Sequence, residues 1–136
     1  DHTALEREVT VGANTEIKNS VFLPKSSIHS EYFGDSVVGH DTKIGAGTIT
    51  ANRKFRKDGE RPEIESDLMA KDYSQESGRS FLGAFIGDNV DIGVNVSIMP
   101  GVQIGSDAKI GPGTVVHQNV EHGETIFVKQ EQVRKK

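Results

Sequence analysis

Aliphatic residues recur at every sixth position through the C-terminal half of the chain. A small or β-branched residue follows each of them four places later, as in Val90, Val96 and Val102. This period fits neither an amphipathic helix, whose period is about 3.6, nor plain strand alternation. It is typical of short strands joined by tight turns, with three faces per coil and coils that stack over one core. The residues that open these hexapeptides are Ile86, Ile92, Ile98, Ile104, Ile110 and Val116.

The same pattern, less regular, runs through the N-terminal half. Between Leu23 and Val38 the spacing is 15 residues, which is two hexapeptides plus three. Because breaks in a solenoid period map to loops on one face, we expect an irregular segment at about 24–37. The openers in this half are Val11, Ile17, Leu23, Val38 and Ile44, and Thr50 stands where another would begin.

A second and longer break spans residues 52–82, which are rich in charge. Lys57-Asp58-Gly59-Glu60 is a strong turn signal inside it. We therefore predict a loop or hairpin, inserted at about 53–81, that projects from the coils. Its basic run, Arg53-Lys54-Phe55-Arg56-Lys57, is either a solvated surface or a mobile cationic flap over an anionic substrate. After the last hexapeptide, Glu124 to Lys129 has strand composition and is expected to cap the final coil, and 130–136 is expected to be a frayed polar tail.

Composition narrows the class of protein. At 136 residues the chain is one domain, and 34% hydrophobic residues suffice for a coil that buries one or two side chains in six. The absence of Cys excludes a disulfide framework, a thiolate metal site and a thiol acyl-enzyme. No apolar run approaches about 18 residues and the N-terminus is not signal-like, so we expect a soluble, cytoplasmic protein without a membrane partner. The net charge of −4 argues against nucleic-acid binding.

One motif is more specific than the repeats. His29, Tyr32, Gly34 and Asp35 form His-x-x-Tyr-x-Gly-Asp, and Gly-Ala-Gly-Thr-x-x-x-Asn follows, ending at Asn52. The chain resembles the C-terminal acetyltransferase domain of bifunctional sugar-1-phosphate nucleotidylyltransferase/acetyltransferases, the GlmU-like enzymes that make UDP-N-acetylglucosamine. The insertion and the later Ser-Ile-Met-Pro-Gly-Val are similar to the archaeal-type branch. Since the chain opens on Asp1, residues 1–136 are expected to be an excised C-terminal domain without the nucleotidylyltransferase half.

The resemblance implies a fold, an assembly and a reaction. The fold would be a left-handed parallel β-helix; the period alone does not fix the hand, and the general rule for parallel crossovers favours right-handed connections. The assembly would be a homotrimer with sites between neighbouring subunits. The reaction would be N-acetylation of an amino-sugar 1-phosphate by acetyl-CoA without a metal. Glucosamine 1-phosphate is the preferred acceptor, and galactosamine 1-phosphate is the second possibility.

The resemblance also assigns the catalytic residues. His29 would be the general base, a role that suits an imidazole with an ordinary pKa near 6.5. Asn52 would lie near the amine and the acetyl group, where its amide can both donate and accept. The backbone N–H of Ala46 would stabilise the oxyanion, and its glycine neighbours permit a close approach of backbone. Without the resemblance, each is an ordinary surface or turn residue of a solenoid.

The binding residues follow in the same way. Lys18 and Tyr32 would hold the sugar phosphate, and Lys43 stands where the family has a sugar-contacting Asn. Ala46, Val94 and Lys129 would contact coenzyme A; Val94 replaces a Ser, and Lys129 replaces an Arg, which keeps the charge but loses the bidentate fork. The family's phosphate-binding Arg would fall at or before Asp1.

Three other functions fit parts of the pattern. A hexapeptide carbonic anhydrase needs three zinc-binding His, and the spacing of His117 and His122 fits two of them, but the third would fall at Phe81. A non-catalytic β-helix tail that trimerises or regulates a nucleotidylyltransferase is the main rival. Another hexapeptide O- or N-acyltransferase with a different acceptor is the third. The combination of His29, Tyr32 and Asn52 favours the acetyltransferase, because a purely structural tail does not need it.

Overall fold

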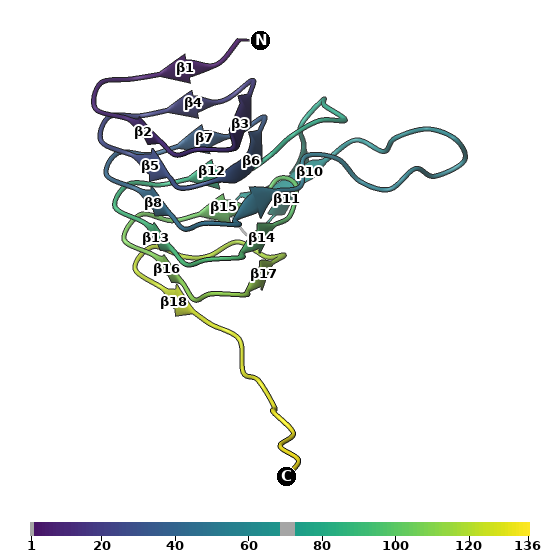
Figure 1. Ribbon diagram of the computed structural model, residues 1–136. Coiled ribbons are helices and arrows are strands. Elements are labelled where there is room, and N and C mark those ends of the chain that lie inside the picture. The colour runs from purple at the N-terminus through teal and green to yellow at the C-terminus, as the bar shows by residue number, and fades with distance from the viewer. Residues whose placement is uncertain (1, 69–72) are drawn as a thin grey trace.

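The chain forms a three-faced parallel β-helix from which one insertion projects (Figure 1). The computed structural model describes residues 2–68 and 73–136. Most strands are two residues long, and parallel pairing joins each coil to the next. This confirms the predicted hexapeptide solenoid, and the winding is consistent with the left-handed form. Within the described residues, nothing has the length and hydropathy of a membrane-spanning helix.

Each coil passes through three faces in turn, which we call the first, second and third face. The first face stacks β1 (Ala4–Leu5), β4 (Val21–Phe22), β7 (Val37–Val38), β12 (Phe85–Ile86) and β15 (Gln103–Ile104). The second face stacks β2 (Thr10–Val11), β5 (Ser27–Ile28), β8 (Lys43–Ile44), β13 (Asp91–Ile92), β16 (Lys109–Ile110) and β18 (Thr125–Ile126). The third face contains the pair β3 (Thr15–Lys18) and β6 (Glu31–Gly34) and the stack β9 (Ile49–Thr50), β14 (Ser97–Ile98) and β17 (Val115–Val116).

The core is a set of inward-facing residues stacked coil upon coil. Ile86 pairs with Val38 on one side and with Ile104 on the other, and all three are buried. Buried hydroxyls at the turns hold neighbouring coils together. Thr48 Oγ1 donates to the Gly93 carbonyl (2.8 Å) and accepts from the Val96 N–H (3.1 Å). The fifth residue of a hexapeptide is therefore small because it turns a corner, and where it is polar it bonds to backbone.

The predicted register is wrong by one residue at Leu23. Phe22 is fully buried and points inward, whereas Leu23 is half-buried at the following turn. The coil that begins at Phe22 reaches the equivalent Val38 after 16 residues, whereas Ile86 and Ile104 are 18 apart. This coil is therefore two residues shorter, with one residue fewer on each side of Phe33, the inward residue of β6.

The expectation of an irregular loop at 24–37 is also wrong, because the broken period comes from a shortened coil. That segment contains β5, β6 and the start of β7, so it forms regular faces. Two aromatic rings fill the shortened coil: Phe22 and Phe33 meet edge to face, with centroids 5.9 Å apart.

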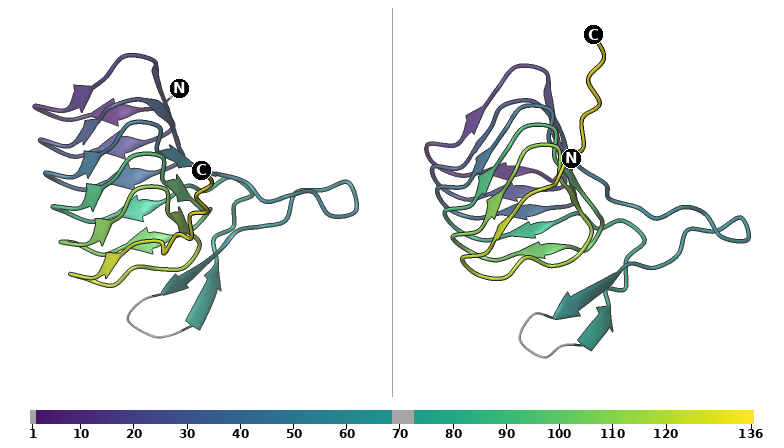
Figure 2. Two further views of the ribbon diagram at one scale, coloured as in Figure 1. Left: turned by 60° about the horizontal axis from the view of Figure 1, so that its bottom comes forward. Right: turned by 90° about the horizontal axis from the view of Figure 1, so that it is seen from below.

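The insertion at 53–81 is confirmed, and it has two parts that leave the same edge of the solenoid (Figure 2). The first is an arm whose tip is the predicted turn. Lys57 and Glu60 exchange both backbone hydrogen bonds (2.8 and 3.0 Å), and Asp58 and Gly59 have positive φ. The second is an antiparallel hairpin of β10 (Glu65–Leu68) and β11 (Tyr73–Glu76). Residues 69–72 of the predicted insertion lie outside the described residues.

Ile64 and Ser66 fasten the insertion to the solenoid, and Gln103 Nε2 on β15 donates to Ser66 Oγ (3.1 Å). Ile64, just before β10, is fully buried, and Ser66 Oγ donates to the Gly101 carbonyl (2.8 Å). Its two ends meet where the Leu82 N–H donates to the Asn52 carbonyl (2.9 Å). At the other end of the chain, β18 covers the last coil as predicted, and 127–136 extend away from the solenoid outside any strand (Figure 1).

Candidate functional site

A cavity of about 530 Å³ opens where the third face turns toward the first face of the next coil. This turn recurs in successive coils at Asn19 and Asp35, and the insertion departs from it at Asn52. Lys18, Tyr32 and Asn52, three of the predicted site residues, all line the cavity. They come from different coils, so it is the stacking that brings them together. The full lining is Lys18, Asn19, Tyr32, Asp35, Asn52, Arg53, Arg79 and Phe81.

A hydrogen-bonded network occupies the floor of this cavity. Asn52 Nδ2 donates to Asp35 Oδ2 (2.7 Å) and to Tyr32 Oη (3.0 Å). Asn19 Nδ2 makes a longer contact with Asp35 Oδ1 (3.4 Å). Gly34 is required here, since a Cβ at this position would lie 2.2 Å from Tyr32 Oη. The glycine of the His-x-x-Tyr-x-Gly-Asp motif thus makes room for the phenol.

The electrostatics of the cavity combine one carboxylate with three cations. Burial raises the pKa of Tyr32, and the negative charges of Asp35 and Glu16 raise it further. The phenol therefore stays protonated at neutral pH and can donate its O–H. Lys18, Arg53 and Arg79 outnumber Asp35, so the cavity favours an anion.

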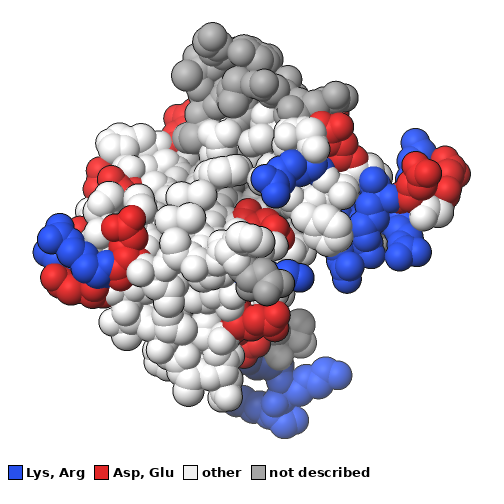
Figure 3. Space-filling view, turned by 90° about the horizontal axis from the view of Figure 1, so that it is seen from above, with Lys and Arg blue, Asp and Glu red and all other residues white. Residues whose placement is uncertain are grey.

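Asp35 and Arg79 line this cavity although neither was predicted to do so. Asp35 was part of the recognised motif but had no assigned role. Arg53 belonged to the cationic run of the predicted flap. Arg79, at the far end of the insertion, gave no signal, because it reaches the cavity only when the two ends of the insertion close. Figure 3 shows the arm's Lys and Arg side chains gathered on one side of the molecule, with acidic residues at its tip.

Apart from Asn52, the residues predicted for acetyl transfer lie at another corner, where the second face turns into the third. His29 follows β5, Ala46 follows β8 and Val94 follows β13, so they occupy the same turn of three successive coils. The Asn95 N–H donates to the Ala46 carbonyl (2.9 Å), and the Gly47 N–H donates to Ser30 Oγ (3.1 Å). His29 is exposed. Tyr32 is three positions further along the chain, so the two Cα atoms lie at most about 11 Å apart.

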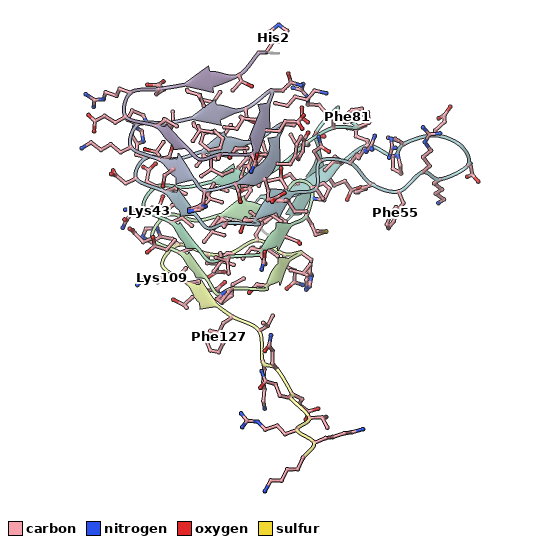
Figure 4. The ribbon with its side chains drawn as sticks, viewed as in Figure 1. His2, Lys43, Phe55, Phe81, Lys109 and Phe127 are labelled. Carbon is pink, nitrogen blue, oxygen red and sulfur yellow. The ribbon has the colours of Figure 1, made fainter. Side chains whose placement is uncertain are left out.

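Two predicted site residues lie away from both corners. Lys43 is on the outward side of the second face, on the opposite side of the solenoid from Phe81 at the cavity (Figure 4). Lys129 lies in the exposed segment after β18. One chain therefore does not bring Lys43 or Lys129 to the cavity, and their roles remain predictions. His117 and His122 are exposed, and no group of three metal-binding side chains occurs in the described part of the chain.

The fold and the six-residue repeats together show the class of protein, which is a hexapeptide-repeat β-helix. Residues 83–118 match the family model for the bacterial transferase hexapeptide (six repeats). The particular relatives confirm the resemblance seen in the sequence. The chain is 44% identical, over 93% of its length, to the bifunctional sugar-1-phosphate nucleotidylyltransferase/acetyltransferase of Sulfurisphaera tokodaii. It is 40% identical over 99% of its length to the bifunctional protein GlmU of Methanococcus vannielii. It spans 30% and 31% of the length of these relatives.

Solved structures share the fold at low sequence identity. A serine acetyltransferase from Entamoeba histolytica is 12% identical with a TM-score of 0.53, and the match covers 93% of this chain and 36% of that one. A GDP-perosamine N-acetyltransferase from Caulobacter crescentus, solved with CoA and GDP-perosamine, is 16% identical with a TM-score of 0.50. That match covers 93% of this chain and 50% of that one.

Proposed function

We propose that this chain is an acetyl-CoA-dependent N-acetyltransferase that acts on an amino-sugar 1-phosphate, with glucosamine 1-phosphate preferred and galactosamine 1-phosphate the second candidate. The observation that carries the proposal is the cavity that gathers Lys18, Tyr32 and Asn52. Its volume of about 530 Å³ lies within the usual range for small-molecule sites. Its three cations suit a phosphate, and its amide and phenol suit the polar ring of a sugar. The name of the Sulfurisphaera tokodaii relative, a sugar-1-phosphate nucleotidylyltransferase/acetyltransferase, supports an acetyl transfer to a sugar phosphate, and we place the reaction in UDP-N-acetylhexosamine synthesis.

In the proposed mechanism the amine nitrogen attacks the thioester carbonyl carbon directly. His29 accepts a proton from the amine, and the Ala46 N–H donates to the oxyanion while the C–S bond breaks. The thiolate of coenzyme A leaves, and no acyl-enzyme forms. Lys18, Arg53 and Arg79 anchor the phosphate, which holds the amine in place for attack. Acetyl-CoA lies toward the corner of Ala46 and Val94, and Lys129 approaches its phosphates. This transfer needs no metal.

We further propose that the active form is a homotrimer. The second face is solvated, since its outward row includes Lys43, Asp91 and Lys109. The other two faces present apolar side chains: Phe85 is 39% exposed on the first face, and Val115 is 53% exposed on the third. A cyclic trimer needs two different patches on each copy, one for each neighbour. Light scattering after gel filtration measures the mass, and Phe85→Lys is expected to shift it toward monomer.

Thiol release from acetyl-CoA tests the reaction. We expect release with glucosamine 1-phosphate and a slower reaction with galactosamine 1-phosphate. Glucose 1-phosphate, which lacks the amine, should give no thiol release. Glucosamine, which lacks the phosphate, should react with a much higher KM than glucosamine 1-phosphate. A folded chain that releases no thiol with either amino-sugar phosphate would support the non-catalytic tail. Release with an acceptor that lacks the amine would support another hexapeptide acyltransferase.

A further inference from the structure

Asp35 is the one acid that lines the cavity among the described residues, and it faces an amide rather than a cation. Its Oδ2 accepts from Asn52 Nδ2 at 2.7 Å, and its Oδ1 is 3.4 Å from Asn19 Nδ2. Amides from the preceding coil and from the following coil therefore flank the carboxylate.

The chemistry of these groups fixes which way the Asn52 amide points. An ionised carboxylate only accepts hydrogen bonds, so it must face the nitrogen of the amide and not its oxygen. The second hydrogen of Asn52 Nδ2 is directed at Tyr32 Oη (3.0 Å). Both amide hydrogens are thus engaged, and Asn52 Oδ1 has no hydrogen-bond donor in the described part of the chain. Asn52 Oδ1 is the atom left to accept from a ligand.

From this geometry we infer that Asp35 is a positioning residue that fixes Asn52 as a hydrogen-bond acceptor and Tyr32 as a donor. The inference rests on the proposed function, and it states which part of the substrate each group meets. The Asn52 carbonyl would accept an N–H from the amine of the acceptor sugar, and the Tyr32 O–H would donate to a phosphate or hydroxyl oxygen. Without Asp35 the amide could turn over and donate its N–H₂ to the lone pair of the amine, the electron pair that must attack the thioester.

The backbone does not account for a carboxylate at this position. Asp35 has φ +52, a left-handed conformation that Asn adopts at least as readily, and Asn19 holds φ +49 one coil earlier. Asp35→Asn therefore keeps the turn and the size of the side chain while removing the charge that orients Asn52. Asp41→Asn is the matched control, since Asp41 has φ +55 at an exposed turn of another corner.

A double-mutant cycle on the trimeric enzyme tests the inference through activity with glucosamine 1-phosphate. We expect Asp35→Asn to lower kcat/KM by about 10- to 100-fold, because Asn52, which contacts the reacting amine, is then less well oriented. In the Asn52→Ala background the same change should have an effect below about twofold, because its target is gone. Asp41→Asn should leave kcat/KM unchanged. Losses that multiply in the double variant would overturn the inference, since Asp35 would then act without Asn52.

A second measurement does not depend on turnover. In the unmodified chain, the two Nδ2 hydrogens of Asn52 should have NMR chemical shifts unlike those of a solvated asparagine amide, because one faces a carboxylate and the other a phenol. In Asp35→Asn these shifts should move, whereas Asp41→Asn should leave them in place. Identical Asn52 amide shifts in the unmodified chain and in Asp35→Asn would overturn the contact. If the chain acetylated no amino-sugar phosphate, the proposed function would fail, yet this comparison would still decide whether Asp35 orients Asn52.

Discussion

The coils before the insertion and those after it fill their cores with different side chains and at different spacings. From Phe85 to Val120 the inward residues are aliphatic except for Thr114 and keep a strict period of six, and this segment contributes only Val94 to the candidate site. From Val21 to Asn52 the period breaks and two Phe rings fill a shortened coil. This segment contains the whole motif and three residues that line the cavity, Tyr32, Asp35 and Asn52. The regular coils form a uniform stack, and the irregular coils carry most of the residues of the candidate site.

The largest expected effect lies in the regular region. Ile104 is 2% exposed between Ile86 and Val120, so Ile104→Asp would bury a charge without a partner. We expect the chain to lose its cooperative thermal transition and its assembly. Thr125→Asp is the control, because Thr125 points outward from β18 and is exposed. A native-like melting curve for Ile104→Asp would show that the coil register is wrong.

In the irregular region the largest expected effect is on chemistry, with the fold intact. His29→Ala should lower kcat by about 10²- to 10⁴-fold if His29 is the general base. Because His29 is exposed at a corner, the melting temperature and the oligomer mass should stay the same. His117→Ala, another exposed histidine on a later coil, serves as the control. Equal turnover in the two variants would remove His29 from the mechanism.

Sequence predicted the regular region better than the irregular one, for a physical reason. A period of six is a local property, so the inward residues from Ile86 to Val116 could be read directly. The register at Leu23 was wrong because Phe22 and Leu23 are both apolar, and only the length of the neighbouring turns decides which one faces the core. The hydrogen-bond partners of the buried hydroxyls at the corners could not be predicted either. Thr48 donates to the Gly93 carbonyl, which lies beyond the insertion in the sequence.

The candidate site was predictable only as far as its motif reached. Tyr32 and Asn52 were named from the motif, and the structure places them in contact. Arg79 could not be named, because its position depends on how the insertion closes against Asn52. Lys43 was assigned by the resemblance alone; strand alternation points it outward from the second face, and its role stays a prediction.

The contribution of the insertion is tested by the cations that it brings to the cavity. Arg79→Ala and Arg53→Ala should each raise KM for glucosamine 1-phosphate by about five- to tenfold, since each removes one partly exposed contact to phosphate. The effect should vanish with glucosamine, which has no phosphate. Arg134→Ala, in the extended tail, is the control. An unchanged KM in both variants would leave the insertion without a role in binding the phosphate.

The smallest expected effect concerns the link between the two regions. Asp88, at the start of the regular coils, accepts from the His40 N–H at 2.8 Å, and His40 belongs to the coil before the insertion. This N–H lowers the pKa of Asp88, and the His40 side chain lowers it further, against an opposing effect of desolvation. Because the pKa of Asp88 is lower in the folded chain, the ionised carboxylate stabilises the fold at every pH above the ordinary pKa of an aspartate. This stabilisation is lost as the pH falls through the lowered pKa.

Asp88→Asn should therefore lower the melting temperature at neutral pH, and the difference from the unmodified chain should disappear in acid. The shift should be only about 1–2 °C, because Asp88 is 59% exposed and solvent screens the interaction. Asp41→Asn, at the equivalent corner, should produce no such pH-dependent difference. A loss that persists unchanged in acid would mean that Asp88 joins the two regions through packing, and that its charge contributes nothing.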